Sequence, residues 1–161
     1  LLGDVEEIYG VATSGIWKLD GAEDNGIVIM RSPAGKHAVL QATWSEWKGY
    51  RFHVEAYGDR GMVRASYAPM MSSAIYLDKP GGSRRRTFNL YPANIVREKL
   101  RGWQSTVIRG FRKEIVDFVA LCAGRAGVIA DGFAGFRAAE IADAVHRCTR
   151  ERAAIRLAVP F

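Results

Sequence analysis

The sequence predicts an α+β domain in which a predominantly antiparallel, open sheet is followed by two helices. Apolar residues alternate with a period of two from Asp4 to about Leu90, and the period becomes helical after Arg97. Strands that come first and helices that come after, in one block, are typical of layered α+β domains. The length of 161 residues suits one domain, so we expect a single domain over residues 1–161.

The clearest strand pair is a hairpin that joins residues 26–31 to residues 36–44. The turn at residues 32–35 reads Ser-Pro-Ala-Gly, and proline and glycine favour such a reversal. In the first strand, Ile27 and Ile29 alternate with two further apolar residues, so both sides are apolar. We expect one side of the sheet to pack against helices and the other to be an oligomer or domain interface. A closed barrel or sandwich is the alternative.

A second hairpin joins residues 50–57 to residues 62–67. Its turn, Gly58-Asp59-Arg60-Gly61, contains two glycines, which permit the positive φ angles of a tight antiparallel turn. Further strands are expected at residues 6–13, 74–77 and 86–90.

Two helices are expected to form a hairpin against the sheet. Ser105 or Thr106 caps the first, which stops at Gly124, and Asp131 caps the second. The apolar stripe of the first helix consists of Ile108, Phe111, Ile115, Phe118, Val119 and Cys122. The stripe of the second, which is expected to face inward, consists of Phe136, Ala139, Ile141, Ala142, Val145 and Cys148. Residues 154–159 are expected to close the chain as a strand with Ile155 and Leu157 inward.

The composition indicates a soluble, cytoplasmic protein with no membrane partner. Hydrophobic residues make up 48% of the chain, and no apolar run approaches the roughly 18 residues of a membrane-spanning helix. We expect Cys122 and Cys148 to be free thiols, with a single bridge between the two helices as the alternative. Neither cysteine has the spacing of a zinc ligand, so no metal site is expected.

The net charge of +6 raises the question of nucleic acid. The only basic run is Arg84-Arg85-Arg86, which follows a turn-forming segment and is expected in a solvated loop or at a strand start. A nucleic-acid binder would combine this run with stacking on Tyr91 or Trp103. No RNP-type motif or basic helix face accompanies the arginines, so nucleic acid is not expected as a partner.

The order of elements and several motifs resemble the C-terminal domain of the Gfo/Idh/MocA oxidoreductases. The most specific match is residues 54–63, which are similar to the family's "[LI]-E-[IV]-x-G-x-x-G-x-[LI]" segment. Further features of the family also have similar segments here. Its first strand resembles residues 2–10, its "E-D" turn residues 23–26 and its "N-G-x-x-A" hairpin residues 34–38. Its closing helices resemble residues 111–118, 131–133 and 138–145.

The resemblance implies a parent enzyme that binds NAD or NADP on an N-terminal Rossmann domain through a G-x-G-x-x-G loop. No such loop occurs here, and the family's Asp and His acid/base pair would lie upstream of Leu1. Asp78-Lys79-Pro80 looks like the family's Glu-Lys-Pro, but it follows the hairpins, so we reject Lys79 as a catalytic residue. We therefore expect a C-terminal piece of a larger enzyme, with no catalytic, cofactor-binding or metal-binding residue of its own.

In that family the sheet domain forms part of the wall around a sugar, polyol or related hydroxyl compound. Aromatic rings suit such ligands because their faces pack on C–H bonds. The candidate substrate-binding residues are Trp103, Trp47, His53 and Tyr50. The expected partners are the missing Rossmann domain, a sugar-like substrate and further copies of the chain, as a dimer or tetramer formed through the open sheet face. The alternative is a stand-alone, non-catalytic dimerisation or binding module.

Overall fold

The computed structural model describes residues 2–17 and 20–158, and the chain divides into two compact units. Unit 1 combines the chain up to Trp47 with the chain from Ala130 onward, and unit 2 is Lys48–Ile129. The single domain over residues 1–161 stays a prediction.

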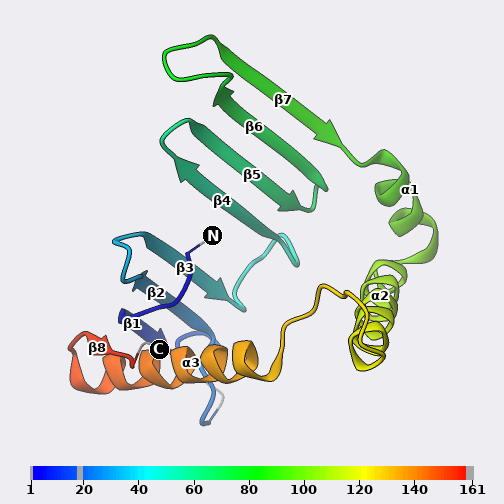
Figure 1. Ribbon diagram of the computed structural model, residues 1–161. Coiled ribbons are helices and arrows are strands. Elements are labelled where there is room, and N and C mark those ends of the chain that lie inside the picture. Colours follow the sequence, from blue (N-terminus) through cyan, green and yellow to red (C-terminus); the bar gives the residue numbers. More distant parts are fainter. Residues whose placement is uncertain (1, 18–19, 159–161) are drawn as a thin grey trace. The chain divides into compact units, whose positions relative to one another are not determined.

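Unit 1 is a four-stranded antiparallel sheet with a helix along one face (Figure 1). The strand order is β3-β2-β1-β8, so the second strand of the chain lies between its two hairpin partners. The elements are β1 (Glu7–Thr13), β2 (Asn25–Arg31), β3 (His37–Thr43), α3 (Gly132–Glu151) and β8 (Ile155–Arg156). The predicted hairpin across residues 32–35 is confirmed, with Arg31 opposite His37.

The core of unit 1 lies between β1 and α3. Ile8 and Cys148 are fully buried, and the Cys148 thiol donates to the carbonyl oxygen of Ile8 at 3.4 Å. Gly10 lets β2 and α3 lie close to β1, because a Cβ there would lie 2.9 Å from the carbonyl oxygen of Ile27 and 3.2 Å from Cγ1 of Val145. The core also includes Val5, Val28, Ala144 and Ile155.

Helix α3 begins as predicted, since the Asp131 carboxylate accepts a hydrogen bond from the Ala134 N–H at 2.8 Å. The predicted inward stripe is partly wrong. Phe136 is exposed, and the neighbouring Arg137 is buried in its place because its guanidinium satisfies backbone carbonyl groups. The closing strand is shorter than predicted, and Val159 lies outside the described residues.

Unit 2 is an antiparallel meander of four strands followed by two helices (Figure 1). Each strand pairs only with its neighbours in sequence. The elements are β4 (Phe52–Gly58), β5 (Gly61–Tyr67), β6 (Met71–Leu77), β7 (Arg84–Leu90), α1 (Pro92–Arg101) and α2 (Gln104–Cys122). No residue of unit 2 falls in the buried class, so neither face of its sheet forms a closed core within the unit.

The β4–β5 turn has the predicted position, and its second glycine, whose φ is +158°, has a further reason to be glycine. The hairpin pairs Gly58 with Gly61, and only Asp59 and Arg60 form the loop. A Cβ on Gly61 would lie 2.2 Å from the carbonyl oxygen of Ile75. Glycine is therefore required where β5 passes close to the backbone of β6.

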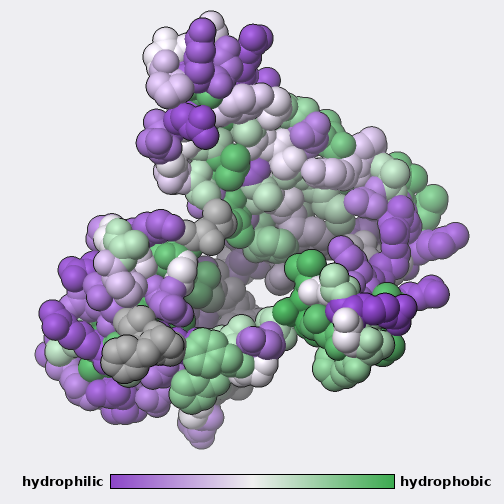
Figure 2. All heavy atoms as spheres, in the orientation of Figure 1, coloured by the Kyte–Doolittle hydropathy of each residue, from purple (hydrophilic) through white to green (hydrophobic). Residues whose placement is uncertain are grey.

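The predicted fold class is confirmed: the structure is α+β, both sheets are antiparallel, and neither closes into a barrel. The structure differs in having two sheets and a helix, α1, that was not predicted. The stripe of α2 from Ile108 to Cys122 was expected to pack against the sheet, but α2 has no buried residue, and within unit 2 it packs chiefly against α1. Hydrophobic residues accordingly appear on the surface over α2 in Figure 2. Both cysteines are free, Cys122 exposed and Cys148 buried.

Candidate functional site

Tyr50 lies in a group of three touching rings in unit 2, which we call the aromatic cluster: Tyr50, Phe52 and Tyr67. The register of the β4–β5 hairpin places Phe52 opposite Tyr67, and their rings stack with centroids 5.9 Å apart. Tyr50 lies just before β4 and meets Tyr67 edge-on at 5.6 Å and Phe52 at 6.1 Å. Tyr50 is 77% exposed, so a ligand can reach its ring.

Glu98 on α1 completes the polar edge of the aromatic cluster. The Tyr67 hydroxyl donates to both carboxylate oxygens of Glu98, at 3.0 and 3.2 Å. Burial, followed by this hydrogen bond, raises the pKa of Tyr67, so the phenol remains a protonated donor at neutral pH. The arrangement offers ring surfaces for C–H groups, and phenol and carboxylate oxygens for hydroxyl groups.

The other predicted site residues do not join the aromatic cluster. His53 alternates with Phe52 along β4, so it projects from the opposite face of the sheet. Trp103 is the N-cap residue of α2 and is 60% exposed. Trp47 is 98% exposed and belongs to unit 1. Their role in substrate binding stays a prediction.

Three members of this site were missed from the sequence: Phe52, Tyr67 and Glu98. The hairpin offered a signal for two of them, because pairing Gly58 with Gly61 also pairs Phe52 with Tyr67. Glu98 gave no such signal, since it lies on the helix that was not predicted.

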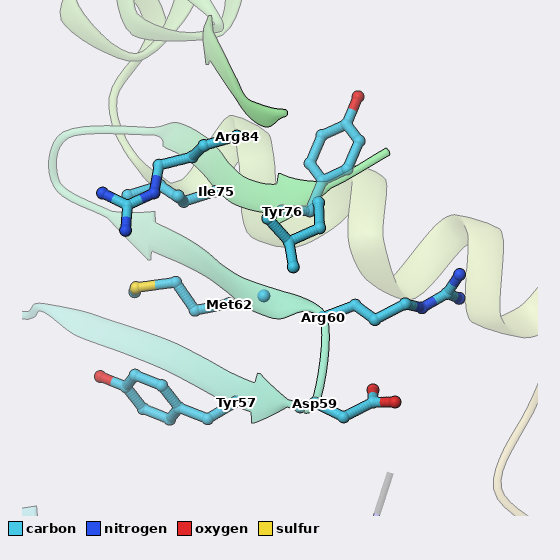
Figure 3. Close-up of a pocket in the computed structure, with 10 residues that line it drawn as sticks. Tyr57, Asp59, Arg60, Met62, Ile75, Tyr76 and Arg84 are labelled. Carbon is cyan, nitrogen blue, oxygen red and sulfur yellow. The ribbon is translucent and has the colours of Figure 1, made fainter. Parts of the chain in front are cut away.

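A second concave feature, which we call the hairpin groove, lies at the end of the unit 2 sheet beside the β4–β5 turn. Its volume is about 360 Å³. Figure 3 shows the side chains of Tyr57, Met62 and Arg84 extending to one side, while Asp59 and Arg60 of the turn extend to the other. The groove is also lined by Gly58, Gly61, Ile75, Tyr76 and Leu77.

The described residues do not fit a metal ion or a nicotinamide dinucleotide. Across residues 2–17 and 20–158, no three His, Cys, Asp or Glu side chains come together in a way that could hold a metal. Dinucleotides bind at parallel βαβ units, whereas every strand pair of the described chain is antiparallel. In the same part of the chain, no helix is both long and apolar enough to cross a membrane.

Comparison with known proteins agrees with the predicted resemblance. Residues 1–64 match the family model described as GFO/IDH/MocA C-terminal domain, which confirms the resemblance over this part of the chain. The match includes the Glu55 to Gly61 segment on which the resemblance most depends. A search of curated proteins found no match.

Solved structures of dehydrogenases and oxidoreductases share the fold. The WlbA dehydrogenase from Bordetella pertussis, in complex with NADH and UDP-GlcNAcA, is 17% identical with a TM-score of 0.67, over 99% of this chain and 44% of its own. An oxidoreductase from Agrobacterium radiobacter, in complex with NAD+, L-tartaric acid and magnesium, is 16% identical with a TM-score of 0.67, over 96% and 44%. The aldose-aldose oxidoreductase from Caulobacter crescentus, complexed with glycerol, is 16% identical with a TM-score of 0.60, over 96% and 42%. The chain thus spans less than half the length of these proteins.

Proposed function

We propose that the chain is the substrate-binding and oligomerisation part of an NAD(P)-dependent oxidoreductase that acts on a sugar, a polyol or a related hydroxyl compound. The family match over residues 1–64 supports the enzyme class. NAD or NADP would be held by a Rossmann domain outside this chain, because the described residues do not fit a dinucleotide. A cytoplasmic location is part of the proposal, and the two free cysteines support it.

The observation that carries the substrate class is the aromatic cluster. Its rings are held in place by one another and by the Tyr67–Glu98 hydrogen bond, so a ligand meets a surface that is already ordered. Sugars and polyols present C–H groups and hydroxyl groups together, which matches ring faces bordered by a phenol and a carboxylate.

Binding of myo-inositol and glucose tests this assignment. We expect either compound to shift the amide resonances around Tyr50 and Tyr67 in ¹H–¹⁵N spectra, and Tyr50→Ala to weaken binding by about three- to tenfold. Tyr76→Ala is the matched control, since the register places Tyr76 on the same face of the same sheet at its other end. Equal losses in both variants, or no saturable shift in the wild-type chain, would contradict the assignment.

Turnover by the isolated chain tests whether the cofactor and the proton-transfer groups are held outside it. Mixed with NAD or NADP and a panel of sugars and polyols, the chain is expected to produce no change in nicotinamide absorbance. Sustained turnover at ordinary enzyme rates would show that the hydride carrier and the proton-transfer groups are held by this chain after all.

The partner proposal rests on the uncovered face of the unit 1 sheet. α3 covers the face that carries Ile8, whereas the alternate side chains project from the other face. That face, which we call the open face, carries Tyr9, Val11, Ile27, Ile29 and Val39, all between 44% and 69% exposed. Contiguous apolar patches of this kind mark interaction sites, so we propose a dimer or tetramer formed through the open face.

A further inference from the structure

The arginine run at 84–86 is divided between the two faces of the unit 2 sheet. It forms the start of β7, which is an edge strand, so successive side chains point to opposite faces. Arg85 points one way and its Nε lies 3.7 Å from Oδ2 of Asp78. Arg84 and Arg86 share the other face. All residues of unit 2 are described, and within this unit neither guanidinium forms an ion pair or a hydrogen bond.

The two unpaired arginines border the hairpin groove. Arg84 lines the groove, and the register places Arg86 opposite Ile75, another lining residue. Figure 3 shows Arg84 on the same side as Met62 and Tyr57, which offer an apolar and aromatic surface.

Neither Glu55 on β4 nor Asp59 in the turn pairs with Arg84 or Arg86. Glu55 lies 3.1 Å from Nη1 of Arg64 and accepts the Tyr57 hydroxyl at 2.7 Å, so its oxygens are already engaged. Asp59, in the turn, also lines the groove, but its carboxylate extends away from Arg84 in Figure 3. Arg84 and Arg86 therefore offer two unpaired cations beside the ring of Tyr57 and the thioether of Met62.

We propose that the hairpin groove binds a small organic phosphate, with the phosphate held by Arg84 and Arg86 and its organic part against Tyr57 and Met62. Guanidinium groups bind phosphate through paired, charge-assisted hydrogen bonds. The Cα atoms of residues two apart on a strand are roughly 7 Å apart. Arginine side chains are long enough for both guanidinium groups to reach one phosphate or diphosphate across this distance. This site is separate from the aromatic cluster and does not depend on the proposed activity.

A small ligand fits the groove better than a nucleic acid does. A polynucleotide requires a track of cations along several phosphates. Here Arg85 is paired with Asp78, and Arg60 of the turn extends away from Arg84 in Figure 3, which leaves Arg84 and Arg86 together at one end of a groove of about 360 Å³.

The test uses the complete 161-residue chain with phenyl phosphate and inorganic phosphate as probes, at low salt, followed by ¹H–¹⁵N spectra. We expect saturable shifts at residues 57–62 and 75–86, and tighter binding of phenyl phosphate than of inorganic phosphate. The double variant Arg84→Gln/Arg86→Gln should lose at least about tenfold in affinity. Arg85→Gln, on the same strand, should change affinity less than about twofold, although each substitution removes one positive charge.

Several results would overturn the proposal. If the loss of affinity for each positive charge removed were the same in Arg85→Gln as in the double variant, binding would depend on general charge attraction. A single-stranded oligonucleotide could bind more tightly than phenyl phosphate through Arg84 and Arg86, which would indicate a nucleic-acid surface. If the double variant kept its affinity but aggregated, the arginines would serve to protect an exposed sheet edge. Unchanged circular dichroism spectra will show that both variants remain folded.

Discussion

Arg137 and Val5 are joined by a buried hydrogen bond, in which Nη2 of the arginine donates to the carbonyl oxygen of Val5 at 2.7 Å. The same guanidinium donates through Nη1 to the carbonyl oxygen of Ala158 at 2.9 Å and pairs with Glu140. One side chain of α3 thus fixes the segment before β1 and the segment after β8.

Replacing this arginine should destabilise unit 1. Arg137→Met keeps the aliphatic stem but leaves two backbone carbonyl groups and one carboxylate without their donor, so we expect a loss of about 2–4 kcal/mol in the free energy of unfolding. Urea denaturation followed by circular dichroism measures it. Arg147→Gln on the same helix removes an exposed pair with Glu151 and should cost less than about 0.5 kcal/mol. Similar losses in both variants would contradict the role assigned to Arg137.

The Asp24 carboxylate should make the loop before β2 sensitive to acid. Backbone N–H groups of Trp17, Ile16 and Gly15 donate to it, and they lower the pKa of Asp24 to about 2. A folded pKa below the unfolded value of 3.8 means that the stabilisation is complete above about pH 4 and is lost as the pH falls towards 2. Asp24→Asn should lower the urea midpoint at pH 7, and the difference from the wild-type chain should shrink between pH 4 and pH 2. A difference that is constant with pH would contradict this account.

Gly61 should tolerate no side chain. In Gly61→Ala the new Cβ would overlap the Ile75 carbonyl oxygen and lie 2.7 Å from Cα of Tyr76, and backbone atoms cannot rotate away. We expect destabilisation of about 2–3 kcal/mol, measured by thermal unfolding. Gly110→Ala is the opposite case, because Gly110 lies inside α2 with no atom within 4 Å of the added methyl group. That variant should gain about 0.5–1 kcal/mol.

The open face should control the oligomeric state. Ile29 lies in the central part of this face, between Tyr9 on β1 and Val39 on β3. Ile29→Lys places a charge there and should convert the oligomer to a monomer in light scattering coupled to gel filtration. Lys36→Glu, in the β2–β3 turn, should leave the mass unchanged. A monomeric wild-type chain would contradict the proposed interface.

The strands could be predicted because turn chemistry and the period of two agree. The turns at residues 32–35 and 58–61 are both where the sequence placed them. Helix α1 was missed because it has only ten residues, begins with Pro92 and buries none of its apolar side chains. Its omission also hid Glu98, and so the polar edge of the aromatic cluster.

Burial was harder to predict than secondary structure. The position of Arg137 in the core depends on carbonyl groups at Val5 and Ala158, which no periodicity within α3 reveals. The apolar spacing of α2 indicated a helix correctly, but spacing alone does not say which surface the stripe meets, and unit 2 buries no residue of α2.

The contact between Ile8 and Cys148 has a consequence for how the protein is made, because the two residues are 140 positions apart. During synthesis, β1, β2 and β3 leave the ribosome long before α3 exists, and nothing in their own unit can then cover the side chains around Ile8. The three strands therefore expose the apolar side chains around Ile8 until α3 is synthesised, and we expect chaperones that bind such surfaces to associate with the nascent chain during that interval.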